Sequence, residues 1–134
     1  MKRYWLVIAV CALLGGCGLE VSSADLFQLT RTGQGKPLTL IVNDGGTMRC
    51  NGASAKPISD PLLLQARALV TSLGKDAKRK LYLAPAPGSV FSYSLRLQEG
   101  TIMFADNARA GHPELAQAEL FALRAAREVC GLSG

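Results

Sequence analysis

Apolar and polar residues alternate along the first part of the chain with the period of two that predicts β-strands. The segments with this pattern and with β-branched or aromatic content are 26–31, 38–42 and 47–50. Residues 33–37 are rich in glycine and end in proline, and residues 43–46 read Asn-Asp-Gly-Gly, so both segments predict turns. The pattern therefore predicts three strands joined by short connections.

A second hairpin is predicted further along the chain. Residues 91–97 alternate strictly, with apolar side chains at every odd position, and residues 98–101 form a turn before a second strand at 102–105. Between the two predicted sheet regions, residues 51–59 read as a loop, and residues 81–83 are a possible short edge strand before two prolines.

The apolar period changes to that of a helix after residue 59. Asp60 and Pro61 resemble an N-cap followed by proline at the first helical position. The apolar positions of this helix are Leu62, Ala66, Leu69 and Leu73. Gly74 is expected to follow its last turn, which gives an amphipathic helix of about 13 residues.

A second helix is expected from His112-Pro113, with Glu114 in its first turn, Cys130 in its last turn and Gly131 as the stop. Its apolar stripe is rich in alanine, which indicates close approach to the sheet: Leu115, Ala118, Ala122, Ala125, Ala126 and Val129. The order β-β-α-β-β-α predicts an α+β fold, a small antiparallel sheet of about four to five strands with both helices packed on one face. Residues 26–134 are expected to form one domain.

The N-terminus has the layout of a bacterial secretory signal. Two cations, Lys2 and Arg3, precede an apolar run over residues 4–14, which is about half the roughly 20 residues that a membrane-spanning helix requires. The run ends in Leu14-Gly15-Gly16-Cys17, which resembles the lipobox of bacterial lipoproteins. The resemblance implies that residues 1–16 are removed and that Cys17 becomes the lipidated N-terminus of an extracytoplasmic protein. Residues 17–25 would then form a tether. The alternative is an ordinary signal peptide that contains a cysteine.

Charge and composition narrow the class of partner. The whole chain carries a formal charge of +5; loss of Lys2 and Arg3 leaves 13 basic and ten acidic side chains, a balance of +3. A weak positive charge on an exported domain does not indicate nucleic acid as the partner.

The cysteines fall into two classes. Cys11 lies in the apolar run and Cys17 is the expected lipid attachment site, which leaves Cys50 and Cys130 in the exported domain. An even pair in an oxidising compartment predicts a disulfide. It would close a loop of about 81 residues, which corresponds to roughly 4–5 kcal/mol of stabilisation. The alternative is two separate buried thiols.

The residues that commonly carry catalysis do not form a recognisable pattern. His112 is the only histidine and stands at a predicted helix start, and no Cys-x-x-Cys spacing indicates a metal site. Four aspartates fall at predicted turns or caps: Asp44, Asp60, Asp76 and Asp106. We therefore expect a protein that is not an enzyme and that needs neither a metal nor another cofactor.

One basic cluster follows the first predicted helix: Lys75, Lys78, Arg79 and Lys80. Its residues are either a solvated helix end, where the helix dipole favours cations, or a contact to anionic lipid or wall polymer, to which each cation near the surface adds about 1 kcal/mol. Arg96 and Arg109 flank the second hairpin and its exit loop, where solvated positions are expected for both.

Residues 26–130 are similar to emfourin, a small bacterial family that inhibits thermolysin-type metallopeptidases. The similarity rests on a first strand ending in Arg31 and Gly33, the amphipathic helix 62–73, an aromatic strand pair, and a last helix opened by proline. The matching positions in the later part are Tyr93, Leu95, Leu97, Gly100, Phe104, Asp106, Pro113 and Leu115. The Cys50/Cys130 pair is additional to that pattern, and no inhibitory residue is carried over.

These observations lead to one expectation and one alternative. We expect a lipid-anchored domain without catalysis that binds a protein partner, and the resemblance to emfourin implies the role of a peptidase inhibitor. The alternative is an envelope lipoprotein that binds a small ligand, lipid or wall polymer between the sheet and the helices.

Overall fold

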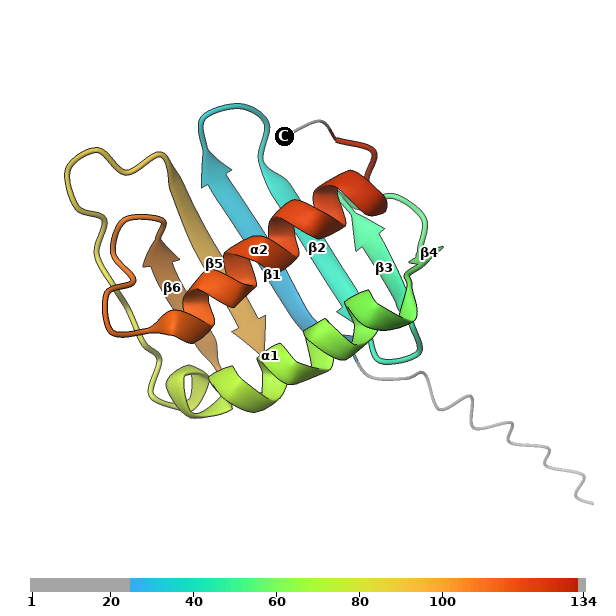
Figure 1. Ribbon diagram of the computed structural model, residues 1–134, viewed down its shortest axis with the longest axis horizontal. Coiled ribbons are helices and arrows are strands. Elements are labelled where there is room, and N and C mark those ends of the chain that lie inside the picture. Colours follow the sequence, from blue (N-terminus) through green and yellow to red (C-terminus); the bar gives the residue numbers. More distant parts are fainter. Residues whose placement is uncertain (1–24, 133–134) are drawn as a thin grey trace, which may run out of the picture.

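Six antiparallel strands form one sheet, and two helices cover one of its faces (Figure 1). The computed structural model describes residues 25–132, and every count below refers to that range. The strands are β1 (Asp25–Gly33), β2 (Leu38–Asn43), β3 (Thr47–Cys50), β4 (Lys56–Pro57), β5 (Phe91–Leu97) and β6 (Thr101–Ala105). Their order across the sheet is β4-β3-β2-β1-β5-β6, and the helices are α1 (Asp60–Lys78) and α2 (Pro113–Glu128). The α+β class and the placement of the helices are confirmed.

β1 is central because it pairs with both β2 and β5. Its residue Leu29 lies opposite Leu40 on β2 and Leu95 on β5, and all three side chains are fully buried. Since side chains alternate between the faces of a strand, this register places the apolar positions of every long strand on the helical face. The core therefore lies between this face and the helices.

α1 is longer than the sequence predicts. It continues through Gly74 to Lys78, because Ala77 extends the buried stripe by one more turn after Leu73. Its N-cap is Ser59 and not Asp60, and Ser59 makes no side-chain capping bond. The chain leaves the helix through Lys80, which takes a left-handed backbone conformation (φ 55°).

α2 runs antiparallel to α1 across the sheet (Figure 1). Its alanines Ala118, Ala122 and Ala125 are fully buried, as the predicted close approach requires. Phe121 packs edge-on against Phe27 of β1, with ring centroids 5.4 Å apart. The helix ends at Glu128, so Cys130 lies just beyond it and not in its last turn.

The sheet has more strands than the four to five expected. The additional strand is β4, which pairs with β3 at the sheet edge inside the segment predicted as a loop. A two-residue strand has no alternation to detect, and Pro57 is tolerated because it lies on an edge. The possible strand at 81–83 is a single parallel bridge between Tyr82 and Met103 of β6. Asp25, expected in the tether, is the first residue of β1.

Candidate functional site

The face of the sheet opposite α1 and α2 carries polar side chains. These side chains occupy the alternate positions of each strand and are exposed or half-buried, whereas most of the positions between them are buried. They are mostly hydroxyl and amide groups: Gln28, Thr30, Thr39, Asn43, Thr47, Ser92, Ser94 and Thr101. No helix of residues 25–132 lies over this face, which we call the open face.

Four residues of the open face form a line across four neighbouring strands. The register pairs Gln28 of β1 with Arg96 of β5 on one side and with Ile41 of β2 on the other. Ile41 is in turn paired with Arg49 of β3. We call these four residues the arginine row: Arg96, Gln28, Ile41 and Arg49. Since neighbouring strands lie about 4.8 Å apart, the two arginine backbones are separated by roughly 14 Å.

The polar side chains of the arginine row have no partner among the residues that the structure describes. Both arginine side chains are exposed, and neither they nor the Gln28 side chain make a hydrogen bond or ion pair to any residue in the 25–132 range. Three side chains with unused hydrogen-bond donors therefore lie in one line on the open face, with the apolar Ile41 between Gln28 and Arg49.

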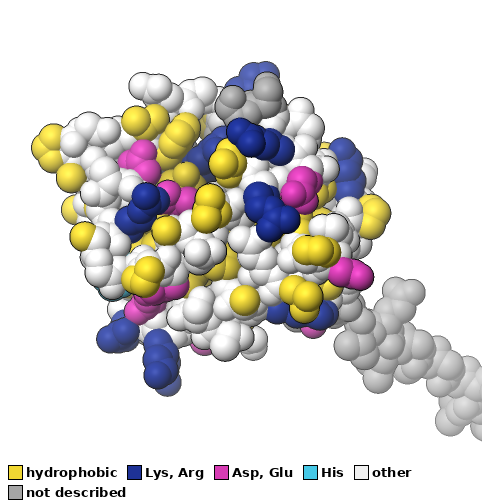
Figure 2. Space-filling model, viewed as in Figure 1, with side chains coloured by type: hydrophobic (Ala, Val, Ile, Leu, Met, Phe, Trp, Pro, Cys, Tyr) yellow, Lys and Arg dark blue, Asp and Glu magenta, His cyan; other side chains and the backbone are white. Residues whose placement is uncertain are grey.

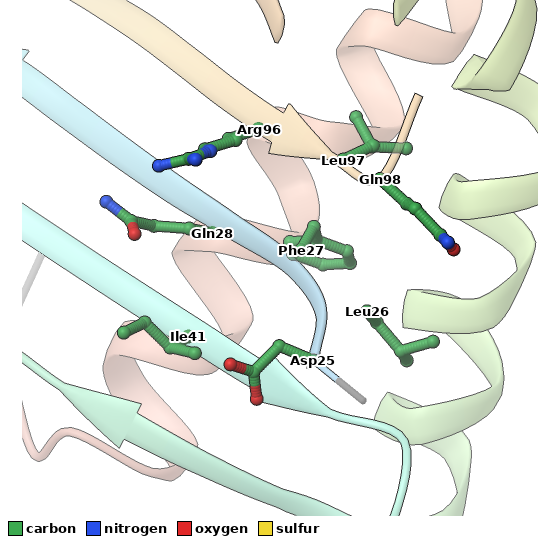
Figure 3. Close-up of a pocket in the computed structure, with 8 residues that line it drawn as sticks. All are labelled: Asp25, Leu26, Phe27, Gln28, Ile41, Arg96, Leu97 and Gln98. Atoms are coloured by element: carbon green, nitrogen blue, oxygen red, sulfur yellow. The ribbon is translucent and has the colours of Figure 1, made fainter. Parts of the chain in front are cut away.

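Two shallow hollows lie along the arginine row. The first, of about 420 Å³, includes Asp25, Gln28, Ile41 and Arg96 in its lining, and Figure 3 shows the last three side by side on neighbouring strands. The second, of about 260 Å³, continues past Ile41 to Arg49. Asp25 borders both hollows and accepts a hydrogen bond from the Asn43 side chain at 3.1 Å. The open face is thus slightly hollowed on both sides of Ile41.

A third hollow, of about 410 Å³, lies on the helical face between β1, β5 and α2. The Arg31 guanidinium stands 4.7 Å above the ring of Phe91, and Tyr93 in the same wall stacks on Phe104 with centroids 5.0 Å apart. Arg109 forms an ion pair with Glu119 of α2. We call this site, which combines two arginines with aromatic rings and an acid, the helix-side pocket.

The charged groups of the helix-side pocket are partly desolvated. Burial raises the pKa of Glu119, while the hydrogen bond and the charge of Arg109 act in the opposite direction. Burial, followed by the charge of Glu119, also raises the pKa of the Tyr93 hydroxyl, against the effect of Arg31. The Oε1 atom of Glu119 is buried and has no hydrogen-bond partner among residues 25–132. This oxygen could accept a hydrogen bond from a ligand or from water.

The predicted disulfide is present. Cys50 at the end of β3 is bonded to Cys130 beyond α2, with Cα atoms 5.7 Å apart. The predicted signal peptide (1–16) and the lipid attachment site Cys17 lie outside the described residues.

The basic cluster Lys75, Lys78, Arg79 and Lys80 is exposed where α1 ends. In Figure 2, Lys and Arg side chains project at this corner, at the lower left. Arg79 is paired with Asp76 of the same helix at 2.8 Å. The cluster shares no residue with the arginine row, but Lys80 lines a hollow together with Thr101, the β6 neighbour of Arg96.

Sequence reasoning identified only part of these sites. The sequence predicts solvated positions for Arg96 and Arg109; Arg96 is exposed, whereas Arg109 is half-buried in an ion pair with Glu119. The period-two pattern could have shown that Gln28, Ile41 and Arg49 share a face with Arg96. It could not show that the four residues are aligned, because alignment depends on strand order and register.

No protein-family model, no curated protein and no solved structure matches the chain. Neither helix formed within residues 25–132 has the length and apolar character needed to cross a membrane.

Proposed function

We propose that this protein is a lipid-anchored extracytoplasmic lipoprotein whose domain binds a protein partner through the open face. The observation that carries the proposal is the arginine row, whose two exposed guanidiniums and one amide lack partners within residues 25–132. The Leu14-Gly15-Gly16-Cys17 motif supports the anchor.

The shape of the open face supports a macromolecule over a small ligand. Small molecules are bound in concave sites that enclose most of their surface, whereas protein interfaces are broad and contain arginine more often than the rest of the surface does. The hollows on the open face are shallow, and the arginine row spans four strands. The chemistry of the row favours a partner surface that carries two carboxylate groups on either side of a small apolar contact, because each guanidinium can hold a carboxylate by two hydrogen bonds.

The resemblance to emfourin narrows the partner to an exported metallopeptidase of the thermolysin type. In this case the purified protein slows cleavage of a peptide substrate by such a peptidase, and Arg49→Glu/Arg96→Glu abolishes the effect. If the peptidase keeps its full activity at a saturating concentration of this protein, the inhibitor hypothesis is wrong. The proposal that the open face binds another protein partner then still stands.

The anchor is tested separately from the binding. Expressed in a bacterial host, the wild-type protein should partition into membranes, and mass spectrometry should find a diacylglycerol-modified Cys17 at its N-terminus. Cys17→Ser should release the protein from the lipid-modified fraction. A membrane-bound protein with an unmodified Cys17 would contradict the anchor without bearing on the open face.

The binding is tested by photo-crosslinking in the native envelope. Thr30 lies in the middle of the open face, paired with Thr39 and Ser94, so a photoreactive amino acid at this position should form an adduct with the partner. The same amino acid at Ala68, an exposed position on α1, is the matched control. Adducts at position 30 and not at position 68 are expected.

A pair of charge reversals identifies the contribution of the arginine row. Arg49→Glu/Arg96→Glu should remove the adduct at position 30. Lys36→Glu/Arg127→Glu changes the net charge equally at two exposed positions outside the row and should leave it. If both double variants retain the adduct, or both lose it, the arginine row is not the recognition surface.

The helix-side pocket supports a second function, the binding of a small envelope ligand. The observation that favours it is the buried, unpartnered Oε1 of Glu119 beside the guanidiniums of Arg31 and Arg109. A ligand with a hydrogen-bond donor, an anionic group and an apolar part would match these residues. Thermal-shift screening of such compounds against wild type and Glu119→Gln tests this function, because a ligand that donates a hydrogen bond to the charged carboxylate should stabilise the wild type more than the variant.

A further inference from the structure

The end of α1 and the start of α2 bring three metal-ligating side chains together. Asp76 lies in the last turns of α1, His112 immediately precedes α2, and Glu114 is in the first turn of α2. One ligand atom from each residue lies within 4.8 Å of the other two. The helices run antiparallel, which places these residues at the same end of the molecule although 36 positions separate Asp76 from His112.

We propose that Asp76, His112 and Glu114 form a binding site for a divalent transition-metal ion, with Zn²⁺ the ion that these residues fit best. One imidazole and two carboxylates are a set of nitrogen and oxygen donors that Zn²⁺ accepts, with water as a fourth ligand. Mg²⁺ and Ca²⁺ prefer oxygen alone, so the histidine selects against them. The proposal is independent of the proposed binding function.

The spacing of two ligands already suits a tetrahedral ion. His112 Nδ1 and Glu114 Oε1 are 3.5 Å apart. Bonds of about 2.0–2.1 Å in a tetrahedron place neighbouring ligand atoms roughly 3.3–3.4 Å apart. Both side chains are about a quarter exposed, so they can rotate toward Asp76 without opening the core.

The third ligand is held in place by the fold. Asp76 is the buried charged residue of the described chain, with 7% of its surface exposed. One of its oxygens, Oδ1, accepts a hydrogen bond from Arg79 at 2.8 Å. The Arg79 side chain is 74% exposed and can move into solvent at little cost, so a metal ion can replace it as the charge partner of Asp76.

His112 has no capping function that would compete with the metal. It occupies the N-cap position of α2, yet its side chain makes no capping hydrogen bond. Its ring faces the Glu114 carboxylate instead. An ion bound here would join the segment between β6 and α2 to the end of α1, so its binding would stabilise the folded state.

Isothermal titration of the full chain in detergent with ZnCl₂, and separately with MgCl₂, tests the site. Zn²⁺ should saturate one site that Mg²⁺ does not fill, and it should raise the melting temperature. His112→Gln and Glu114→Gln should each weaken Zn²⁺ binding roughly tenfold or more. Removing a residue that only hydrogen-bonds a metal ligand already lowers metal affinity by about this factor, and these variants remove a ligand itself. Glu128→Gln, which removes an exposed carboxylate at the other end of α2, should bind Zn²⁺ as the wild type does.

Two further measurements keep the result unambiguous. Melting in EDTA shows whether each variant is folded without metal, and the partial exposure of His112 and Glu114 predicts that both are. Zinc bound by Cys11 or Cys17 is common to all the proteins compared, so only the difference between variants is assigned to the site. Equal Zn²⁺ affinity in wild type, His112→Gln and Glu114→Gln overturns the proposal, as does binding of Mg²⁺ with the same affinity as Zn²⁺.

Discussion

The disulfide between Cys50 and Cys130 joins the end of β3 to the residues that follow α2, across 80 positions of sequence. It attaches the chain just after α2 to β3, near one edge of the sheet. The N-terminal end of α2 lies near β6, at the opposite edge (Figure 1). The bond therefore anchors the C-terminal end of a helix that crosses the sheet from β6 to β3.

Reduction of this disulfide should lower the free energy of unfolding by about 3–5 kcal/mol, because the unfolded chain regains the entropy of an open loop. The melting temperature should fall by more than about 10 °C. Thermal melts followed by circular dichroism with and without reductant measure the effect. The Cys50→Ala/Cys130→Ala variant is the control, since reductant should not change its melting curve. Identical melting of the reduced and oxidised wild type would show that the bond does not stabilise the fold.

Two adjacent residues of α2 should respond very differently to truncation. Phe121 is fully buried against Phe27, whereas the Leu120 side chain is half exposed. Phe121→Ala should cost about 3–5 kcal/mol, since it removes apolar contacts and leaves a cavity. Leu120→Ala should change the stability by less than about 0.5 kcal/mol. Urea denaturation of both variants measures the difference, and a similar cost for the two would contradict the assigned orientation of α2.

Gly100, in the turn between β5 and β6, is needed because this turn touches α1. A Cβ atom added here would lie 2.2 Å from the carbonyl oxygen of Ala77. Gly100→Ala should therefore destabilise the protein by roughly 3 kcal/mol, because the hairpin and α1 must separate. Gly35→Ala is the matched control: Gly35 has φ +83° and no atom within 4 Å of the added Cβ, so only backbone strain of about 1–2 kcal/mol applies. If chemical denaturation shows the same loss of stability in Gly100→Ala and Gly35→Ala, the contact between Gly100 and Ala77 is not the cause.

Asp106 should make the stability depend on pH. Burial alone would raise the pKa of this carboxyl, but hydrogen bonds from Ser89, Phe91 and Val90 outweigh it and lower the pKa. The ionised form therefore stabilises the folded protein above the ordinary aspartate pKa of about 4, and this gain is lost as the pH falls through the lower folded pKa.

The variant Asp106→Asn isolates this effect. At pH 7 it should be less stable than the wild type by about 1–2 kcal/mol, because hydrogen bonds to a charged acceptor are lost. The difference should shrink as the pH falls below about 4, where the carboxyl becomes protonated in the unfolded chain, and should vanish only below the lower pKa of the folded protein, where Asp106 itself becomes protonated. Denaturation curves at several pH values compare the two proteins; a difference that stays constant down to the lowest pH would contradict the assigned role of the charge.

Local patterns were sufficient for most of the secondary structure. The alternation at 91–97 and the helical spacing from Leu62 to Leu73 depend on neighbours in sequence, and both elements formed where they were predicted. The boundaries that depend on distant contacts were missed. α1 passes through Gly74 because Ala77 is buried by tertiary packing, and β4 exists because β3 offers it a free edge.

By itself, the sequence determined the α+β class, the polar and apolar faces of the strands, and the two cysteines available to form a disulfide within the domain. Periodicity and residue type are local properties, and these features follow from them. Only the tertiary structure decided that Arg96, Gln28, Ile41 and Arg49 are aligned and that Asp76 meets His112 and Glu114. Both groupings depend on strand register and helix packing, which are set by long-range contacts between segments that have no shared signal in the sequence.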